Sequence, residues 1–453
     1  MTLIRKLSLF AVIALFSFML FSCEEAEECI DRSAEGTLYN FFDPTAGDEV
    51  VITVWLDNES YASALINAFE AANPGYRVNF VEVGSVDTRQ RLELFSGSTA
   101  AADIVVFPHD HIGQALNSNL LYEITGSQAL DLQNRMISSA IQTATACYDM
   151  VANRVIPCEG DAQSFLFGAP LSGESVALFY NKTLLEELTG SPEPAGSFEE
   201  LLAQAELYMD QVDGLFIGLD VGNAYDMHFS ATSFGFELFG PDFNDATQSN
   251  LNSQAMIDAL TWLNGTVRPA ISPNPLNSGD LDGESNRTRF ESGEMPYIVD
   301  GPWSISRYIE AAAINEFEFG VVQLPTLDGQ QPVTFSGVQI AAVYKGTRNP
   351  DAAFRFLEFM TSTEGLAIMY QTTNKLPALE DPSSVPGVTE DPYLGGISAQ
   401  LVFSHPMPII PEMGFFWQNA GTMYSTAWNG TRTPEGAANT AEDGFRGQAG
   451  LLD

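Results

Sequence analysis

Basic residues are scarce in this sequence. Its 453 residues include 19 Lys and Arg against 59 Asp and Glu, which gives a formal net charge of −40 at pH 7. A field of this sign repels phosphate backbones and anionic lipid headgroups. The composition therefore excludes nucleic-acid binding and membrane adsorption through a basic patch, whereas a neutral or cationic ligand remains compatible with it.

Motifs that carry catalysis are missing as well. The chain has no GxxxxGK[ST], no GxGxxG after a strand, no GxSxG elbow, no HExxH and no paired CxxC. The His-Asp-His run at 109–111 is a poor metal site, because successive extended side chains point to opposite faces. The acidic run at 280–284 lacks the full spacing of a calcium loop and is interpreted as a solvated turn. Nothing in the sequence favours an enzyme, a metal or a cofactor.

The first 22 residues have the pattern of an export signal. Arg5 and Lys6 precede an apolar run of about 15 residues, which is shorter than the ~20 helical residues that span a bilayer. The run ends in Leu20-Phe21-Ser22-Cys23, which resembles the bacterial lipobox, where cleavage precedes a lipid-carrying cysteine. We therefore expect a lipoprotein signal peptide at 1–22 and a lipid anchor on Cys23. A plain signal peptide with an incidental Cys23 is the alternative.

The chain has four cysteines, and two of them lie close together. Residues 23–47 are acidic and polar without sustained periodicity, which indicates a flexible tether containing Cys29, a cysteine with no evident partner. Cys147 and Cys158 flank the segment YDMVANRVIP. Because export places them in an oxidising compartment, we expect a disulfide between them. Two buried free thiols are the alternative.

From residue 48 onwards, strand and helix patterns alternate. The apolar run VVITVWL from Val50 is typical of a strand buried on both faces of a parallel sheet. A helical stretch at 61–72, a strand VNFVEV, a helix near 88–95 and a strand DIVVF follow. This order favours an α/β lobe with helices on both faces of its sheet. No Pro-rich or Ser-rich linker follows residue 47, as expected of two lobes that exchange strands or of one large domain.

Eight segments between about Ile52 and Phe445 occur in a characteristic order: ITVW, FEAANPGYRVNF, DIVVFPHDHIGQALNSNLLYEI, PLSGESVALFYNKTLL, FESGEMPYIVDGPWS, FGVVQLPTLDGQ, ALEDP after FLEFMTSTEGL, and PIIPEMGFFW. Behind a lipobox, this series resembles the extracytoplasmic solute-binding proteins of ABC importers, in the maltose-binding protein-like branch. The resemblance covers nearly the whole mature chain.

The resemblance implies an α/β protein with the two-lobe periplasmic-binding-protein fold of type II, whose lobes are joined by three hinge segments around a ligand cleft. The implied N-terminal lobe comprises 48–172 and 341–386, and the C-terminal lobe comprises 173–340 and 387–453. The three crossings are expected near Pro170 to Glu174, near Phe335 to Ile340 and near Ala378 to Pro386.

The resemblance also implies the binding residues. In this family a sugar lies on aromatic rings from both lobes, because the C–H faces of a pyranose pack on a ring. Matched motif by motif, the stacking positions are held by Phe107 in place of a Trp, and by Tyr225, Trp303 and Trp417. Core packing is the alternative for each ring taken alone.

Polar groups match the family less completely. Asp110 and Glu174 match carboxylates that accept sugar hydroxyls, here expected from opposite sides of the cleft, and Glu59 with Asp57 and Asn58 follows the first strand. The departures from the family pattern are Ser60 in place of a basic residue, His111 and Gly421 in place of arginines, and Gln418 in place of a Tyr. They keep the aromatic platform and remove cationic donors.

The function implied by the resemblance is that of a lipid-anchored extracytoplasmic receptor of an ABC transporter. It would capture an oligosaccharide of the maltose or maltodextrin kind and deliver it to the permease, as a monomer without catalysis or cofactor, at the outer face of the cytoplasmic membrane or in the periplasm. The alternatives are a receptor for another polyol, glycoside or small cation, and a secreted carbohydrate-active enzyme such as a glycosidase or lyase.

Overall fold

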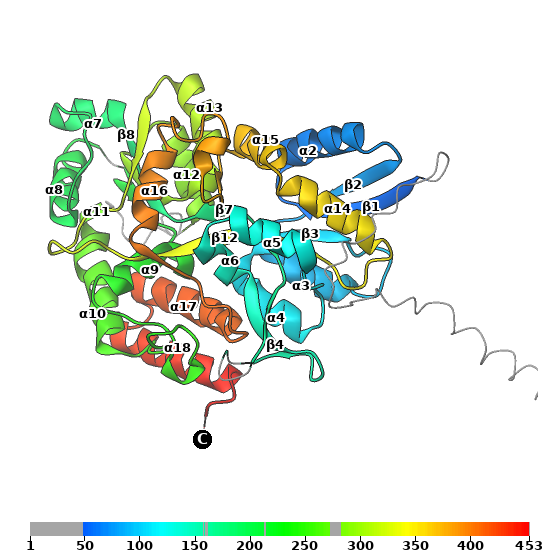
Figure 1. Ribbon diagram of the computed structural model, residues 1–453. Coiled ribbons are helices and arrows are strands. Elements are labelled where there is room, and N and C mark those ends of the chain that lie inside the picture. Colours follow the sequence, from blue (N-terminus) through cyan, green and yellow to red (C-terminus); the bar gives the residue numbers. More distant parts are fainter. Residues whose placement is uncertain (1–48, 157, 159–161, 213, 272–281, 453) are drawn as a thin grey trace, which may run out of the picture. The chain divides into compact units, whose positions relative to one another are not determined.

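The computed structural model describes residues 49–156, 158, 162–212, 214–271 and 282–452 (Figure 1). The expected signal peptide at 1–22, the lipid anchor on Cys23, the tether at 23–47 and Cys29 lie outside these ranges. Within them, no helix combines the length and the apolar character that a membrane span requires.

A seven-stranded sheet organises one half of the described chain. Strand β1 is parallel to β2 and β3, whereas β12 is antiparallel to β3 and β7. The sheet order is β13 (Leu376–Pro377), β7 (Ala169–Glu174), β12 (Thr334–Val343), β3 (Ile104–Pro108), β1 (Val50–Leu56) and β2 (Tyr76–Glu82), with β14 (Ser404–Pro406) paired to the start of β12. The strands expected from VVITVWL, VNFVEV and DIVVF are thus confirmed.

Helices from both ends of the sequence pack beside this sheet. The helix α2, drawn in blue, lies beside α14 and α15, drawn in yellow and orange, although hundreds of residues separate them (Figure 1). The helices associated with this half are α2 (Glu59–Ala72), α3 (Ser85–Phe95), α4 (Ile112–Asn117), α5 (Gly126–Arg135), α6 (Ser138–Thr143), α14 (Pro350–Met360) and α15 (Thr363–Thr373).

The start of α2 shows how the local sequence sets these elements. The Asn58 side chain caps the helix by accepting a hydrogen bond from the Tyr61 backbone N–H at 2.8 Å. The buried residues Tyr61, Ala62, Leu65 and Phe69 recur at helical spacing and face the sheet. The helix expected at 61–72 is therefore confirmed, with its first turn beginning at Glu59.

A second, four-stranded sheet organises the other half. Its order is β11 (Phe319–Val322), β8 (Ala177–Asn181), β10 (Tyr297–Asp300) and β9 (Ile217–Gly218). The helices of this half are α7 (Lys182–Thr189), α8 (Phe198–Met209), α9 (Ala224–Thr232), α10 (Gln254–Trp262), α11 (Arg268–Ile271), α12 (Gly283–Glu291), α13 (Ile305–Asn315), α16 (Leu394–Leu401), α17 (Met413–Trp428) and α18 (Pro434–Gln448). A π-helical turn, Leu263–Val267, joins α10 to α11.

The segments expected to cross between the lobes lie side by side in the first sheet. Strand β12 separates β7 from β3, and β13 pairs with the other edge of β7. In this register, Glu174 lies opposite Gly337, and Gly173 lies opposite Leu376. The third expected crossing, at 378–386, begins directly after β13. The three strands therefore place residues from distant parts of the chain around Glu174.

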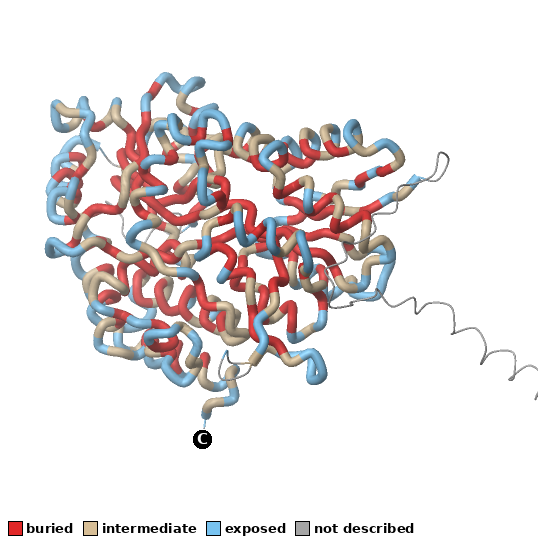
Figure 2. The backbone as a smooth tube through the Cα atoms, viewed as in Figure 1, coloured by how far each residue is buried: buried red, intermediate tan, exposed pale blue. Residues whose placement is uncertain are grey.

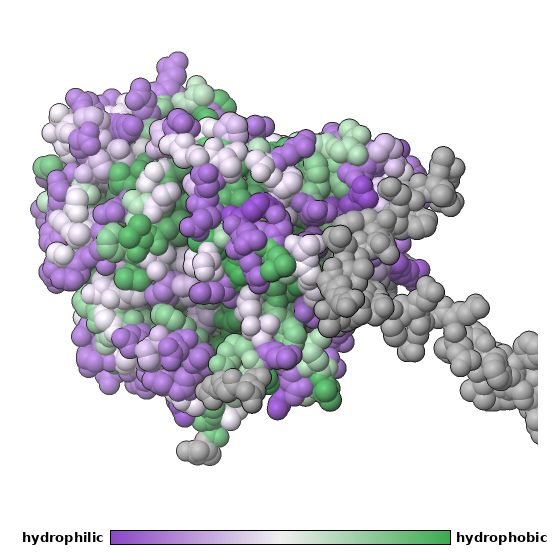
Figure 3. Space-filling view, viewed as in Figure 1, coloured by the Kyte–Doolittle hydropathy of each residue, from purple (hydrophilic) through white to green (hydrophobic). Residues whose placement is uncertain are grey.

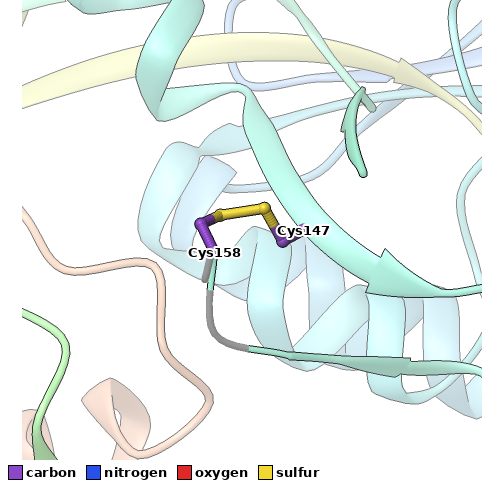
Figure 4. The surroundings of a disulfide bond; sticks show 2 residues. All are labelled: Cys147 and Cys158. Carbon is purple, nitrogen blue, oxygen red and sulfur yellow. A yellow bond between two sulfur atoms is a disulfide. The ribbon is translucent and has the colours of Figure 1, made fainter. Parts of the chain in front are cut away.

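A small three-stranded sheet carries the disulfide. It consists of β5 (Arg154–Val155), β4 (Thr145–Asp149) and β6 (Ser164–Leu166). Cys147 on β4 is bonded to Cys158, with 5.2 Å between their Cα atoms (Figure 4). Closing so short a loop stabilises the fold by about 2 to 3 kcal/mol through the entropy of the unfolded chain.

Buried residues are concentrated in the strands and on the inner faces of the helices (Figure 2). Hydrophilic residues cover much of the face shown in Figure 3, with smaller hydrophobic patches between them. In the second half, the core is aromatic, since Phe290 and Phe319 pack edge-on against the fully buried ring of Tyr308. Burial of each such ring contributes about 1.5 to 3 kcal/mol.

Candidate functional site

The candidate site lies around the ends of β3 and β7, where α9 and α17 approach the start of β12. Asp110 is in a short 3-10 helix (His109–His111) that directly follows β3. Its Oδ2 accepts a hydrogen bond from the Trp417 indole Nε1 at 2.8 Å. Its Oδ1 is buried and has no hydrogen-bond partner among the described residues. Asp110 therefore positions Trp417 with one oxygen and leaves the other as an unused acceptor.

His109 fixes this turn against the rest of the site. The ring is fully buried, its Nδ1 accepts from the Val338 backbone N–H at 3.0 Å, and its Nε2 lies 2.9 Å from the Met407 carbonyl oxygen. Because Nδ1 accepts, Nε2 carries the proton and donates to Met407. Burial lowers the pKa of His109, which favours this neutral form. Across the described ranges, no three His, Cys, Asp or Glu side chains come together as metal ligands.

Glu174 is the centre of a second polar cluster. It is 4% exposed at the end of β7. Its Oε1 accepts from the Ser172 hydroxyl at 3.2 Å, and its Oε2 accepts from Gln339 Nε2 at 3.1 Å. The Lys375 ammonium lies 3.2 Å from Oε1 and 3.7 Å from Asp57 Oδ2. The amide oxygen of Gln339 is buried and lacks a partner in the described part of the chain.

Three aromatic rings surround these acceptors. The Tyr225 ring lies 6.1 Å from Trp303 and 6.5 Å from Trp417, centroid to centroid, and both pairs are tilted. The Tyr225 hydroxyl donates to the Glu174 carbonyl oxygen at 3.3 Å. Phe335, in β12, packs against Tyr225 and Trp417 from behind and is fully buried. The structure thus brings together three of the four rings that the sequence predicts.

Most of the chain is similar to known proteins. Residues 64–395 match the family model described as bacterial extracellular solute-binding protein. This chain belongs to that family. The solute-binding protein is 23% identical over 444 residues to the maltooligosaccharide ABC transporter solute-binding lipoprotein of Streptococcus pneumoniae, covering 96% of this chain and 95% of the relative.

A second relative and a solved structure are also similar to this chain. The galactooligosaccharide-binding protein of Bacillus subtilis is 24% identical over 454 residues, covering 99% of this chain and 98% of the relative. The structure of MalX from Streptococcus pneumoniae in complex with maltopentaose superposes with a TM-score of 0.74 at 22% identity, covering 88% of this chain and all of MalX. The solute-binding protein therefore has the two-lobe α/β fold expected from its sequence.

Two predicted site residues of the solute-binding protein lie elsewhere. Phe107 has no exposed surface and packs under the His111 ring at 6.2 Å, so a sugar cannot lie directly on it in this arrangement. Gln418 is exposed and accepts a hydrogen bond from Gln448 of α18 at 2.8 Å, which holds it on the outer side of α17. Both positions follow from side-chain direction, which motif matching does not specify.

The expectation that Asp110 and Glu174 accept sugar hydroxyls from opposite sides of the cleft stays a prediction, and in the structure both residues adjoin the same sheet. Asp110 follows β3 and Glu174 ends β7, and β12 pairs with both strands in the same sheet. The sequence places Glu174 at a lobe boundary, but strand pairing keeps it beside the first lobe's strands. The turn that carries Asp110 is joined to α17 by the hydrogen bond from Trp417 to Asp110.

The loop after β1 holds the remaining predicted residues. Asn58 is occupied as the cap of α2. Glu59 is exposed and borders an open groove of about 520 Å³ on α2, together with Ser60, Ser63, Ala64 and Asn67. At Gly421, an added Cβ would lie 2.5 Å from the Gly222 carbonyl oxygen, so α17 has no room there for an arginine. His111 stays close to neutral, because burial lowers its pKa despite the opposing attraction of Asp110.

Sequence reasoning missed Lys375, Gln339 and His109 as parts of the site. Lys375 lies between α15 and β13, three residues before the ALEDP segment. A lysine with a nearly buried side chain cannot be distinguished from an exposed one by sequence, although its position just before a predicted crossing segment is a usable signal.

Acid is expected to destabilise the protein partly through His228 on α9. Its Nε2 lies 3.1 Å from His405 Nε2, and its ring stacks on Phe335 at 3.6 Å. Burial lowers the pKa of His228 well below its usual range, and His405 lowers it further. The unfolded chain binds a proton near pH 6.5 and the folded chain does not, so stability falls as pH drops below 6.5, by at most about 1.4 kcal/mol per pH unit.

The variant His228→Phe keeps the stacking and removes the titrating group. Urea unfolding between pH 7 and 5 should then show a shallower loss of stability than in the wild type. The control is Phe198→Leu on α8, which disturbs packing against Phe229. Because Phe229 lies on α9 with His228 but does not titrate, this variant should shift stability equally at every pH. An unchanged pH slope in His228→Phe would contradict the expectation.

Proposed function

We propose that this solute-binding protein captures an oligosaccharide outside the cytoplasm and delivers it to the permease of an ABC transporter, without catalysis of its own. The observation that carries the proposal is a set of buried acceptors without partners in the described chain, Asp110 Oδ1 and Gln339 Oε1, beside the rings of Tyr225, Trp303 and Trp417. Buried acceptors without partners are rare in proteins and call for an explanation.

The chemistry of this set suits a sugar. Hydroxyl groups at the edge of a pyranose ring donate to carboxylate and amide oxygens, while its C–H faces pack on aromatic rings. A polar ligand with several donors would satisfy Asp110 Oδ1 and Gln339 Oε1 together. The relatives named above bind maltooligosaccharides and galactooligosaccharides according to their names, which supports an oligosaccharide here and leaves its linkage to experiment.

The proposal extends to the cellular setting. Anchoring through a lipid on Cys23 would hold the receptor at the outer face of the cytoplasmic membrane or in the periplasm, as a monomer on the tether 23–47. The lobe division proposed here, 48–172 with 341–386 and 173–340 with 387–453, would put the three crossings next to Glu174. Closure about them would bring the aromatic rings onto the ligand.

A thermal-shift screen of the mature protein tests the function. The panel contains maltotriose, maltotetraose, β-1,4-galactotetraose, cellotetraose and xylotetraose, each with its monosaccharide. A ligand at 100 times its Kd should stabilise the fold by about 2.7 kcal/mol. Chromogenic glycosides of the same sugars should not be hydrolysed. The proposal fails if no oligosaccharide raises the melting temperature, or if turnover is observed.

A further inference from the structure

The ammonium group of Lys375 lies between two carboxylates at the base of the site. Its Nζ is 3.2 Å from Glu174 Oε1 and 3.7 Å from Asp57 Oδ2, and its side chain is 13% exposed. The three residues come from separate parts of the fold: the end of β7, the end of β1 and the turn before β13. This ion pair is therefore built by tertiary structure around the acceptors proposed for the sugar.

Electrostatics keep Lys375 charged in this position. Burial by itself disfavours the ammonium, but the attraction of Glu174 and then of Asp57 outweighs it and raises the pKa of Lys375. Moving a charge out of water is unfavourable unless the charge is paired, so a nearly buried lysine at this place depends on both carboxylates. The Glu174 carboxylate in turn depends on Lys375, because Glu174 is 4% exposed and Lys375 is its cationic neighbour.

The contacts also set the direction of Glu174. Lys375 and Ser172 donate to Oε1, and Gln339 donates to Oε2. A carboxylate has about four lone-pair positions, so three donors leave one open acceptor direction. Gln339, oriented by the same carboxylate, holds its own amide oxygen without a partner among the described residues. The cluster thus presents acceptors in fixed directions.

We propose that Lys375 is a positioning and specificity-determining residue, which holds Asp57, Glu174 and Gln339 as an oriented set of acceptors and lowers the affinity of the site for amino-sugar chains. The proposal rests on the oligosaccharide-binding function proposed above. An acidic glycan is repelled by the carboxylates of Asp57, Glu174 and Asp110, and an amino-sugar chain, which those carboxylates attract, is repelled by the Lys375 ammonium. A neutral chain of hydroxyl donors avoids both repulsions. Lys375 thereby replaces the cation that the loop after β1 lacks at Ser60.

Calorimetric titration of Lys375→Met, Glu174→Gln and the double variant tests the proposal. The neutral probe is maltotetraose or, where the wild type does not bind it, β-1,4-galactotetraose, cellotetraose or xylotetraose. Lys375→Met is expected to weaken binding ten- to hundred-fold, because Asp57 and Glu174 lose the cation that fixes their directions and Gln339 loses its oriented partner.

The double variant and a charged probe separate positioning from general damage. In the Glu174→Gln background, Lys375→Met should change affinity by less than about threefold, since the two residues act as a unit. At pH 6.5 a glucosamine tetramer should bind Lys375→Met more tightly than it binds the wild type. The control Lys182→Met removes the same charge on α7, where the ammonium lies over the Tyr180 ring, and should match the wild type.

The outcomes distinguish the two proposals. If the wild type binds no oligosaccharide of the thermal-shift panel, the proposed function fails and this inference falls with it. If the wild type binds a neutral probe and Lys375→Met binds it equally tightly, the inference alone is overturned. Should Lys375→Met not fold, Lys375→Arg takes its place, since it keeps the charge with another geometry. Its affinity should fall because the ammonium geometry is lost, and a wild-type affinity would overturn the inference.

Discussion

Replacement of Trp417 with alanine is expected to weaken sugar binding about a hundredfold. The indole is one of the three rings around the buried acceptors, and its Nε1 is the donor to Asp110 Oδ2. The substitution removes the stacking surface and leaves a second oxygen of Asp110 without a partner. Together these losses amount to about 3 kcal/mol of binding free energy. Calorimetric titration with the sugar found in the thermal-shift screen measures the change.

Matched variants divide this effect into its two parts. Trp417→Phe keeps a ring and loses the hydrogen bond, so its affinity should lie between those of the wild type and Trp417→Ala. Trp303→Ala removes a ring that is not bonded to Asp110 and should cost about tenfold in affinity, or about 1.4 kcal/mol. Trp428→Phe alters a buried tryptophan at the end of the same helix and should leave affinity unchanged. Wild-type affinity in Trp417→Ala would show that the sugar binds elsewhere.

Replacement of Arg287 with methionine is expected to destabilise the fold by about 3 to 5 kcal/mol, as is typical when one partner of a buried ion pair is removed. Arg287 on α12 donates from Nε to Asp300 Oδ2 at 2.9 Å and from Nη2 to Asp300 Oδ1 at 3.3 Å. Asp300 ends β10 and is fully buried, where it also accepts from the Tyr308 hydroxyl at 2.6 Å. The variant leaves this carboxylate without its cation.

A second buried acid adds to the dependence on Arg287. Asp226 is 1% exposed, and neither of its carboxylate oxygens has a hydrogen-bond partner in the described chain. Burial raises the pKa of Asp226 well above its usual range, nearby Asp220 and Asp300 raise it further, and Arg287 opposes them. Loss of the guanidinium therefore leaves several mutually repelling acids in one region of the second half.

Urea unfolding monitored by circular dichroism measures the loss. The control is Arg77→Met, which breaks an ion pair with Glu49 whose side chains are about half exposed, and it should cost at most about 1 kcal/mol because water screens such pairs. Equal losses in the two variants would contradict the view that burial makes the Arg287–Asp300 pair important.

Much of the fold could be predicted because its signals are local. The apolar run from Val50 and the helical spacing of Leu65 and Phe69 follow from side-chain periodicity, which neighbouring residues determine by themselves. The spacing of Cys147 and Cys158 suits the hairpin of β4 and β5 that joins them. The order of the motifs was enough to predict the family and the rings of Tyr225, Trp303 and Trp417.

The exact composition of the site could not be predicted in this way. Phe107 has the residue type of a stacking platform, yet it is in the core, and Gln418 is next to Trp417 in sequence, yet it faces α18. Successive helical residues point about 100° apart, so adjacency in a motif does not give adjacency in a site. Only the pairing of β12 with both β7 and β3 shows that Glu174 and the turn carrying Asp110 adjoin one sheet.

The sequence by itself determined the α/β class, the family and the aromatic character of the site, since these depend on local periodicity and on motif order. Tertiary structure alone decided that Lys375 lies between Asp57 and Glu174, and that Asp110 binds Trp417 with one oxygen only. These contacts join residues hundreds of positions apart, and each depends on burial and on sub-ångström placement. The sequence does not show whether a charged side chain is solvated or paired in the interior. Removing it changes the free energy of unfolding by amounts that differ by several kcal/mol between the two cases.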